Sequence, residues 1–141
     1  MANIQNLIDL LMKHEGVRNK PYEDTVGVLT IGVGRNLDDV GLSIDEIHYL
    51  LNNDIKRCRH ELSGSFDWFL DLDPVRQDAM MDMCFNLGIT RLRGFTNALS
   101  AMECGDYDEA AIEFLDSLWA DQVGQRATTL TNMIRTGEYD A

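Results

Sequence analysis

Three polar residues near the N-terminus have the types and spacing that acid–base chemistry could use. Glu15 follows a run of apolar residues, Asp24 lies nine positions later, and Thr30 lies six positions after Asp24. Hydrolysis of a glycosidic bond needs a neutral carboxylic acid that protonates the leaving oxygen, and a second group that holds or activates water, or attacks. These residues can fill both roles. Spacing alone is a weak signal, because a Glu and an Asp this close together are more often solvated surface.

The surrounding pattern predicts a chain reversal that could bring the three residues together. Apolar residues recur at helical spacing over residues 4–12, and Gly16 follows as a helix C-cap, so Glu15 is expected at a helix end. From residue 20 to residue 34 the helical period is lost, glycines appear and β-branched residues dominate. This stretch indicates a β-hairpin or small sheet.

Helix-start signals organise the rest of the chain. Ser43 and Glu46 form a capping box that opens a long helix, expected over about residues 43–61. Asp73 and Pro74 begin a central, buried helix that ends at Gly88. Further helices are predicted over residues 95–102, 106–119 and 125–135.

These elements predict an α+β fold. At 141 residues the chain has the length of one domain, so we expect a single domain over residues 1–141. Its small β lobe is expected over about residues 15–45, with the long helix linking it to a mostly helical lobe of residues 62–141 that also includes the N-terminal helix. A cleft between the lobes would suit a polymer.

Composition narrows the partners. The net charge of −12, from 24 acidic and 12 basic residues, argues against nucleic acid, because binding to phosphate draws on basic surface. A hydrophobic content of 45% with 26% charged residues is typical of a folded, soluble protein. The N-terminal apolar stretch has no basic flank and is too short to cross a bilayer, so neither a secretion signal nor stable membrane insertion is expected.

Cysteine and histidine positions predict no metal site and no other cofactor. Three cysteines without a paired CxxC motif are expected to be reduced and mostly buried, as in a cytosolic protein. The histidines are not in metal-ligand spacing with one another. The residues concerned are Cys58, Cys84, Cys104, His14, His48 and His60.

Both tryptophans could stack on sugars. Core anchoring is the more usual role of tryptophan, and we assign it to Trp119. Trp68, which neighbours Phe66 and Phe69, could equally pack under the long helix.

Longer motifs connect these residues to a known family. The intervals of eight residues between Glu15 and Asp24, and of five between Asp24 and Thr30, match the catalytic pattern of the phage T4-type lysozymes, which are endolysins and muramidases of glycoside hydrolase family 24. The chain resembles this family over nearly its full length and in the same order. The strings that carry the resemblance include HEG at 14–16, YEDT at 22–25, TIGVG at 30–34, FNLG at 85–88, GFTN at 94–97 and RTGEYDA at 135–141.

The resemblance implies a reaction and roles for the three residues. It implies hydrolysis of the β-1,4 bond between N-acetylmuramic acid and N-acetylglucosamine, with inversion. Glu15 would be the general acid, which requires partial burial that raises its pKa. Asp24 and Thr30 would position water or stabilise the oxocarbenium-like charge, and whether Asp24 is a base or an electrostatic stabiliser stays open. Inversion predicts that the Glu15 and Asp24 carboxyl groups lie about 6.5–9.5 Å apart.

The resemblance also implies residues around this centre. Arg126 matches an arginine that approaches the catalytic glutamate and would support it. Phe85 and Asn86 are the predicted substrate-binding residues. Three other residues depart from the types that the family shows at sugar-contacting positions, namely Asn36, Ala98 and Glu113. We further expect an ion pair between Arg35 and Asp54, where the best-known member has a histidine–aspartate pair.

The implied role is lysis of a bacterial host by cleavage of its peptidoglycan. The protein, expected to be a monomer, would stay in the host cytoplasm until a holin-type protein permeabilised the membrane, and would then act on the cell wall in the periplasm. Two alternatives stay open: a non-catalytic peptidoglycan-binding or virion structural module, which intact Glu15, Asp24 and Thr30 argue against, and the same chemistry on chitin-like polymers, which product analysis would distinguish.

Overall fold

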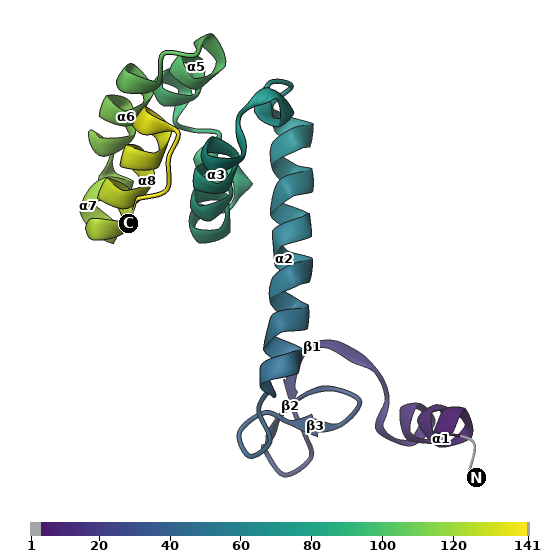
Figure 1. Ribbon diagram of the computed structural model, residues 1–141. Helices are drawn as coiled ribbons and strands as arrows, with labels where there is room; N and C mark the ends of the chain where they lie inside the picture. Colours follow the sequence, from purple (N-terminus) through teal and green to yellow (C-terminus); the bar gives the residue numbers. More distant parts are fainter. Residues whose placement is uncertain (1–3, 141) are drawn as a thin grey trace. The chain divides into compact units, whose positions relative to one another are not determined.

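The computed structural model describes residues 4–140 and is shown in Figure 1. The backbone forms two compact units, Met1–Tyr49 and Leu50–Ala141, and the boundary between them falls within the long helix α2. Helix α1 belongs to the first unit. The single domain, the bounds of the lobes and the grouping of α1 with the helical lobe stay predictions.

The first unit contains helix α1, a small sheet and the start of α2, and the sequence predicts both the N-terminal helix and the sheet. Helix α1, Ile4–Glu15, ends where Gly16 adopts a φ of +78° and its N–H donates to the Met12 carbonyl at 3.0 Å. This confirms the expected C-cap. The sheet is antiparallel, in the order β1-β2-β3. Its strands are β1 Arg18–Glu23, β2 Leu29–Gly32 and β3 Arg35–Asn36.

Helix α2, Ile44–Ser65, begins with the predicted capping box. The Ser43 hydroxyl accepts from the Glu46 N–H at 3.2 Å, and the Glu46 carboxylate accepts from the Ser43 N–H at 2.8 Å. The long helix is confirmed, although it continues four residues beyond the expected end. At 22 residues it is the longest described helix, and no helix within residues 4–140 is both long and apolar enough to cross a membrane.

The predicted ion pair between Arg35 and Asp54 is wrong. Arg35 Nη1 lies 2.6 Å from the Glu46 carboxylate oxygens, and Asp54 pairs with Arg57 at 2.9 Å. Glu46 sits in the first turn of α2, two turns before Asp54, and so lies nearer the strand that carries Arg35. Hydrogen bonding from Arg35 lowers the pKa of Glu46 to about 2.

The second unit is helical. Asp73 caps α3 by accepting from the Arg76 N–H at 3.1 Å, and Gly88 ends that helix, as predicted. The elements after α2 are a 3-10 turn Phe69–Asp71, α3 Pro74–Leu87, α4 Ile89–Leu92, α5 Thr96–Cys104, α6 Tyr107–Leu115, α7 Leu118–Val123 and α8 Gln125–Thr136. The helices predicted from residues 95 and 125 are confirmed.

The helix predicted over 106–119 is wrong in one respect, because it is two helices. Helix α6 ends at Leu115, and α7 begins at Leu118. The Ser117 hydroxyl donates to the Phe114 carbonyl at 2.6 Å and accepts from the Ala120 N–H at 3.3 Å. Serine at this position competes with the helical hydrogen bonds and starts a new helix.

The core of the second unit surrounds α3, which is the predicted buried helix. Helix α8 contacts α3, α6 and α7, and Figure 1 shows α6 and α8 side by side. Trp119 is 1% exposed and packs edge-to-face against Phe95 and Phe114, which confirms its core assignment. Its indole N–H donates to the Asn86 side-chain oxygen at 3.0 Å, so the buried polar atom has a partner.

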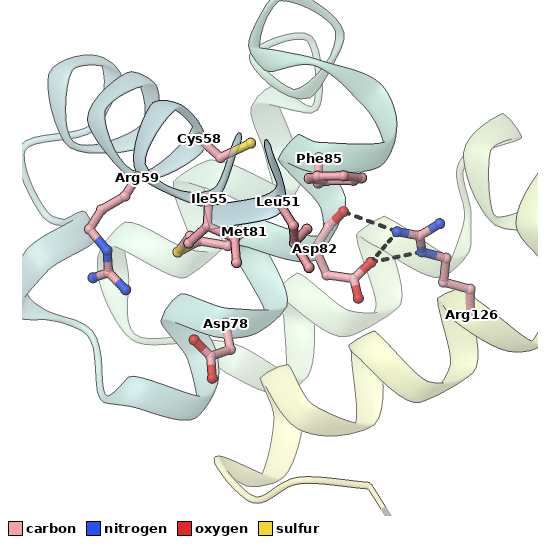
Figure 2. Close-up of a pocket in the computed structure, with 9 residues that line it drawn as sticks. All are labelled: Leu51, Ile55, Cys58, Arg59, Asp78, Met81, Asp82, Phe85 and Arg126. Atoms are coloured by element: carbon pink, nitrogen blue, oxygen red, sulfur yellow. Dashed lines mark hydrogen bonds and ion pairs between the residues drawn. The ribbon is translucent and has the colours of Figure 1, made fainter. Parts of the chain in front are cut away.

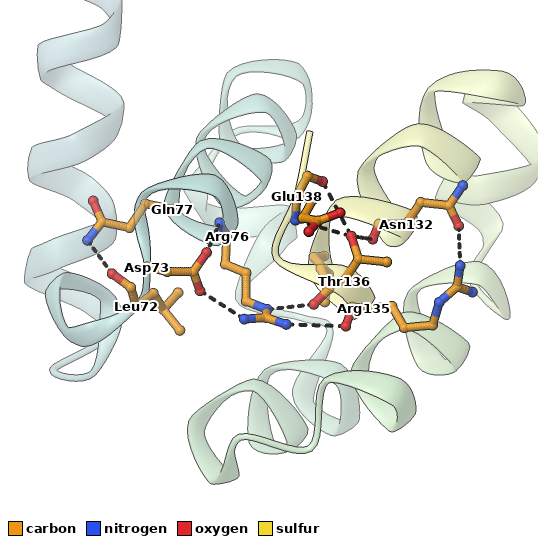
Figure 3. Close-up of polar contacts among 9 residues, drawn as sticks. Leu72, Asp73, Arg76, Gln77, Asn132, Arg135, Thr136 and Glu138 are labelled. Carbon is orange, nitrogen blue, oxygen red and sulfur yellow. Dashed lines mark hydrogen bonds and ion pairs between the residues drawn. The ribbon is translucent and has the colours of Figure 1, made fainter. Parts of the chain in front are cut away.

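Arg76 on α3 holds the end of α8. Its Nε donates to the Ile134 carbonyl at 2.6 Å and its Nη2 to the Arg135 carbonyl at 3.2 Å, as part of the network in Figure 3. Asp73 accepts from its Nη1, and the ring of Tyr107 lies 3.6 Å from the guanidinium carbon. Arg76 therefore satisfies carbonyl groups that the last helical turn leaves without helical partners.

The cysteines are all free thiols, and two of the three are buried, as predicted. Cys84 on α3 lies next to Cys58 on α2, and Cys104 on α5 is exposed. Burial, reinforced by contact with Cys58, raises the pKa of Cys84 to about 12.

Candidate active site

Glu15 ends helix α1 and lies against the turn between β2 and β3. Gly34 occupies this turn with a φ of +64°, and a Cβ placed on it would lie 2.6 Å from Glu15 Oε2. The glycine therefore provides both the left-handed backbone and the space for the carboxyl group. Glu15 is exposed in this structure, which differs from the partial burial expected for a general acid.

Asp24 sits in the turn that follows β1, and its carboxylate is held by the backbone of that turn. Oδ1 accepts from the N–H groups of Val26 and Val28, each at 2.9 Å. The Asp24 N–H donates to the Val28 carbonyl at 2.9 Å, and its own carbonyl accepts from Gly27 at 3.0 Å. This local bonding is typical of aspartate in turns. No hydrogen bond to Oδ2 occurs within residues 4–140, so that oxygen can accept from a ligand or water.

Thr30 lies in β2 and is only 4% exposed. Its hydroxyl donates to the Val28 carbonyl at 2.8 Å. Because the proton is committed to Val28, the hydroxyl oxygen can accept a hydrogen bond from a water molecule. Asp24 and Thr30 are thus both bonded to the backbone of Val28, which fixes the two side chains with respect to each other.

The first unit therefore contains all three residues that the sequence selects. Glu15 comes from a helix end, Asp24 from a turn and Thr30 from the adjacent strand. Such a set can supply a proton donor, a carboxylate and a hydroxyl acceptor, which are the groups that hydrolysis of an acetal bond uses. The catalytic assignment itself stays a prediction.

A separate hollow of about 380 Å³ lies in the second unit, between α2 and α3 (Figure 2). It contains Phe85, the predicted sugar-binding aromatic, which is 51% exposed. Apolar side chains including Ile55 and Met81 form much of the wall. An exposed aromatic ring in a hollow of this size can stack on a flat ligand.

Arg126 and Asp82 form an ion pair at this hollow. Figure 2 shows the two side chains pointing toward one another, with Nη2 and Nε of Arg126 at 2.6 and 2.7 Å from Asp82 Oδ1. The support of Glu15 by Arg126 stays a prediction. Sequence reasoning missed Asp82, although its position three residues before Phe85 places both on one face of α3.

Asn86, the other predicted substrate-binding residue, already has a structural partner. Its side-chain oxygen accepts from Trp119, so only the amide NH₂ can donate to a sugar without breaking that bond. Its role in binding stays a prediction.

Two of the residues that depart from the family pattern lie together in the second unit. Ala98 and Glu113 both line a hollow of about 200 Å³, which also contains Asp116 and the start of α5. A hydrogen bond with Glu113 raises the pKa of Glu109. Asn36 lies apart from them in the chain, in β3 of the first unit.

Comparison with protein families and with curated proteins gives consistent matches. The family model described as phage lysozyme matches residues 12–136. "Probable T4-type lysozyme 1" of Dictyostelium discoideum is 26% identical over 98% of this chain and 98% of its own length. "Endolysin" of Salmonella phage P22 is 31% identical over 81% of this chain and 80% of its own length.

A virion protein also matches. "Pre-baseplate central spike protein Gp5" of Enterobacteria phage T4 is 26% identical over 96% of this chain. The match covers only 28% of that protein, so the chain corresponds to one part of it.

Proposed function

This chain belongs to the phage lysozyme family and is a glycoside hydrolase, and we propose that it cleaves the β-1,4 bond between N-acetylmuramic acid and N-acetylglucosamine in bacterial peptidoglycan. One observation carries the proposal most directly: Asp24 and Thr30 are both anchored to the backbone of Val28. This arrangement holds a carboxylate and a hydroxyl acceptor ready to orient one water molecule.

In the proposed reaction, Glu15 donates its proton to the glycosidic oxygen as the bond to the anomeric carbon breaks. A water molecule held by Asp24 and Thr30 attacks that carbon from the opposite face, and a base takes up its proton, so the configuration inverts. The base is Asp24, or bulk water if Asp24 only stabilises positive charge. Inversion requires room for the water, which corresponds to a carboxyl separation of about 6.5–9.5 Å.

The second unit is proposed to contribute to substrate binding. Phe85 would stack on a sugar ring, and Asn86 would donate an amide hydrogen bond to it. Arg126 would approach Glu15 once released from, or shared with, Asp82. These roles accompany the proposed organisation of residues 1–141 as a single domain.

The proposed biological role is lysis of a bacterial host by a monomeric endolysin. To reach the wall, the endolysin would depend on a holin-type protein that permeabilises the membrane and so lets the endolysin leave the cytoplasm. The similarity to a pre-baseplate central spike protein favours a second candidate, a lysozyme module that forms part of a virion. Both candidates use the same chemistry.

Clearing of purified Gram-negative peptidoglycan tests the proposal. We compare the wild type with Glu15→Gln, which is nearly isosteric but has no carboxylic proton to donate, and with Glu23→Gln as a matched control on an exposed neighbouring carboxylate. We expect clearing by the wild type and by Glu23→Gln but not by Glu15→Gln. Anomer analysis of the first product tests inversion. Equal clearing by all three would contradict the role of Glu15.

Two further outcomes separate the alternatives. Binding to peptidoglycan without release of new reducing ends would indicate a non-catalytic module. Faster turnover of chitin oligomers than of peptidoglycan fragments would move the substrate assignment to chitin-like polymers.

A further inference from the structure

A second aromatic hollow lies in the helical unit, away from Phe85. Its volume is about 250 Å³, and it has no residue in common with the hollow that contains Phe85. The side chains that matter for its chemistry are Phe66, Trp68, Arg93, Ser100 and Glu103. It shares Thr96 with the hollow beside Glu113.

Two aromatic rings form one wall of this hollow. Phe66 and Trp68 are stacked with ring centroids 5.1 Å apart and an angle of 28° between their planes. Both pack against the core and keep part of their surface accessible. The backbone here is also held, because the Phe66 carbonyl accepts from Phe69 and the Trp68 carbonyl accepts from Asp71. Such a wall is already ordered, so a ligand would lose little free energy in ordering it.

Leu99 adds an apolar side chain to this wall, and the remaining lining residues are polar. Arg93, Ser100 and Glu103 have no side-chain hydrogen bond or ion pair with any other residue between 4 and 140. They offer the donors of a guanidinium group, the acceptors of a carboxylate and a hydroxyl that can do both. Arg93 and Glu103 carry opposite charges, so the hollow has no net charge. It therefore favours a neutral polar ligand over an anion or a cation.

We propose that this hollow binds one acetamido-sugar unit of a glycan strand, as a second contact with the polymer outside the catalytic centre. A pyranose ring combines an apolar face, which packs on aromatic rings, with hydroxyl and amide groups around its edge, which suit Arg93 and Glu103. A volume of about 250 Å³ lies just below the roughly 300–1,000 Å³ of pockets for drug-sized ligands, so it fits a single ring. The inference rests on the proposed function, which supplies the glycan.

A second contact would matter for long strands and not for short ones. Holding a strand at two places makes the second binding event intramolecular and raises the overall affinity for the polymer. A fragment too short to reach both places gains nothing. The hollow should therefore affect insoluble peptidoglycan and leave turnover of short oligosaccharides unchanged.

Binding to insoluble peptidoglycan tests the inference. All variants carry Glu15→Gln to prevent cleavage, and bound protein is measured by depletion from the supernatant. We compare Trp68→Ala, Arg93→Gln and Arg91→Gln. The last is the matched control, because Arg91 is an exposed arginine of the adjacent helix α4 that does not line the hollow. We expect about 5- to 10-fold weaker binding for Trp68→Ala and Arg93→Gln, and no change for Arg91→Gln.

Each result decides the question. Equal weakening by Arg91→Gln and Arg93→Gln would show a bulk charge effect and overturn the proposal, as would unchanged binding by Trp68→Ala and Arg93→Gln. If Trp68→Ala unfolds, as judged by circular dichroism, the comparison between Arg93→Gln and Arg91→Gln decides alone.

Activity measurements separate this inference from the proposed function. With Glu15 intact, Arg93→Gln should clear insoluble peptidoglycan more slowly and hydrolyse short soluble fragments at the wild-type rate. If Arg93→Gln lost both activities, the inference would be overturned, but the function proposed for the wild type would still stand. No hydrolysis by the wild type would instead refute the proposed function, and the binding measurement would still report on the hollow.

Discussion

The Cα atom of Gly34 lies beside the carboxyl group of Glu15, so closely that a Cβ placed there would come within 2.6 Å of Oε2. The two residues are 19 positions apart in the chain and belong to a helix end and a turn between strands. A side chain at residue 34 would therefore displace the proposed proton donor. This relationship leads to the first prediction.

Gly34→Ala should lose at least about 10-fold in lytic activity, because the methyl group displaces the Glu15 carboxyl. It should also lose about 1–2 kcal/mol of stability, since alanine disfavours a φ of +64°. Gly105→Ala is the control, with a φ of +77° and no atom within 4 Å of the added Cβ. It should lose similar stability in denaturant titration and keep its activity. Equal losses of activity in both variants would contradict the steric explanation.

Asp24→Asn and Asp24→Ala should separate the charge of this residue from its structural role. Asparagine keeps an oxygen that can accept from Val26 and Val28, so the turn should survive while activity falls by about 100-fold or more. Alanine removes the acceptor as well, so Asp24→Ala should also lose about 1 kcal/mol of folding stability. Peptidoglycan hydrolysis and the thermal midpoint are the measurements. An active Asp24→Asn enzyme would show that the charge is dispensable.

The ion pair between Arg35 and Glu46 should stabilise the fold in a defined pH range. Because the pKa of Glu46 is lowered to about 2 in the folded protein, its contribution is fully present above its ordinary pKa of 4.5 and is lost as the pH falls toward 2. The free energy of unfolding should therefore change less between pH 6 and pH 2.5 in Glu46→Gln than in the wild type, as measured by urea titration. Asp38→Asn, a change at another exposed carboxylate of the first unit, serves as the control. Identical pH profiles for wild type and Glu46→Gln would contradict the pairing.

The three thiols should differ sharply in reactivity. Cys104 is exposed and should react rapidly with a thiol-specific reagent at pH 8, whereas Cys84, with a pKa of about 12, stays protonated and buried. Native protein should contain one rapidly reacting thiol per chain, and urea-unfolded protein should contain three. In Cys104→Ser the fast phase should disappear. Two or more fast equivalents in the native wild type would show that the region around α2 and α3 opens readily.

Lysis should depend little on salt, or should increase with it. The chain carries a net charge of −12, so long-range attraction to an anionic wall cannot drive capture, and screening at about 0.1 M salt reduces repulsion beyond roughly 10 Å. Rates of clearing between 20 and 300 mM NaCl would test this, with viscosity and pH held constant. A steep decline over that range would indicate a local basic surface that captures the substrate.

The sequence predicted features that depend on neighbours in the chain. The capping box at Ser43, the cap at Asp73 and the helix end at Gly16 all follow from hydrogen bonds within a few residues, and all three are present in the structure. The spacing of Glu15, Asp24 and Thr30, together with the longer strings that resemble the family, likewise selected the candidate site. Prediction failed where two local signals compete. The hydrophobic pattern continued past residue 115, but the Ser117 hydroxyl ends one helix and caps the next.

Only the tertiary structure decided which distant groups meet. Arg35 pairs with Glu46 and not with Asp54. Gly34 lies next to the carboxyl group of Glu15. Trp68 and Arg93 line the same hollow. Charge and residue type limit the possible partners of a polar side chain. Several residues of a suitable type nevertheless lie nearby in the sequence. The choice among them follows from how helices and strands pack in three dimensions, because an ion pair or a hollow exists only where backbone geometry brings the groups within a few ångströms.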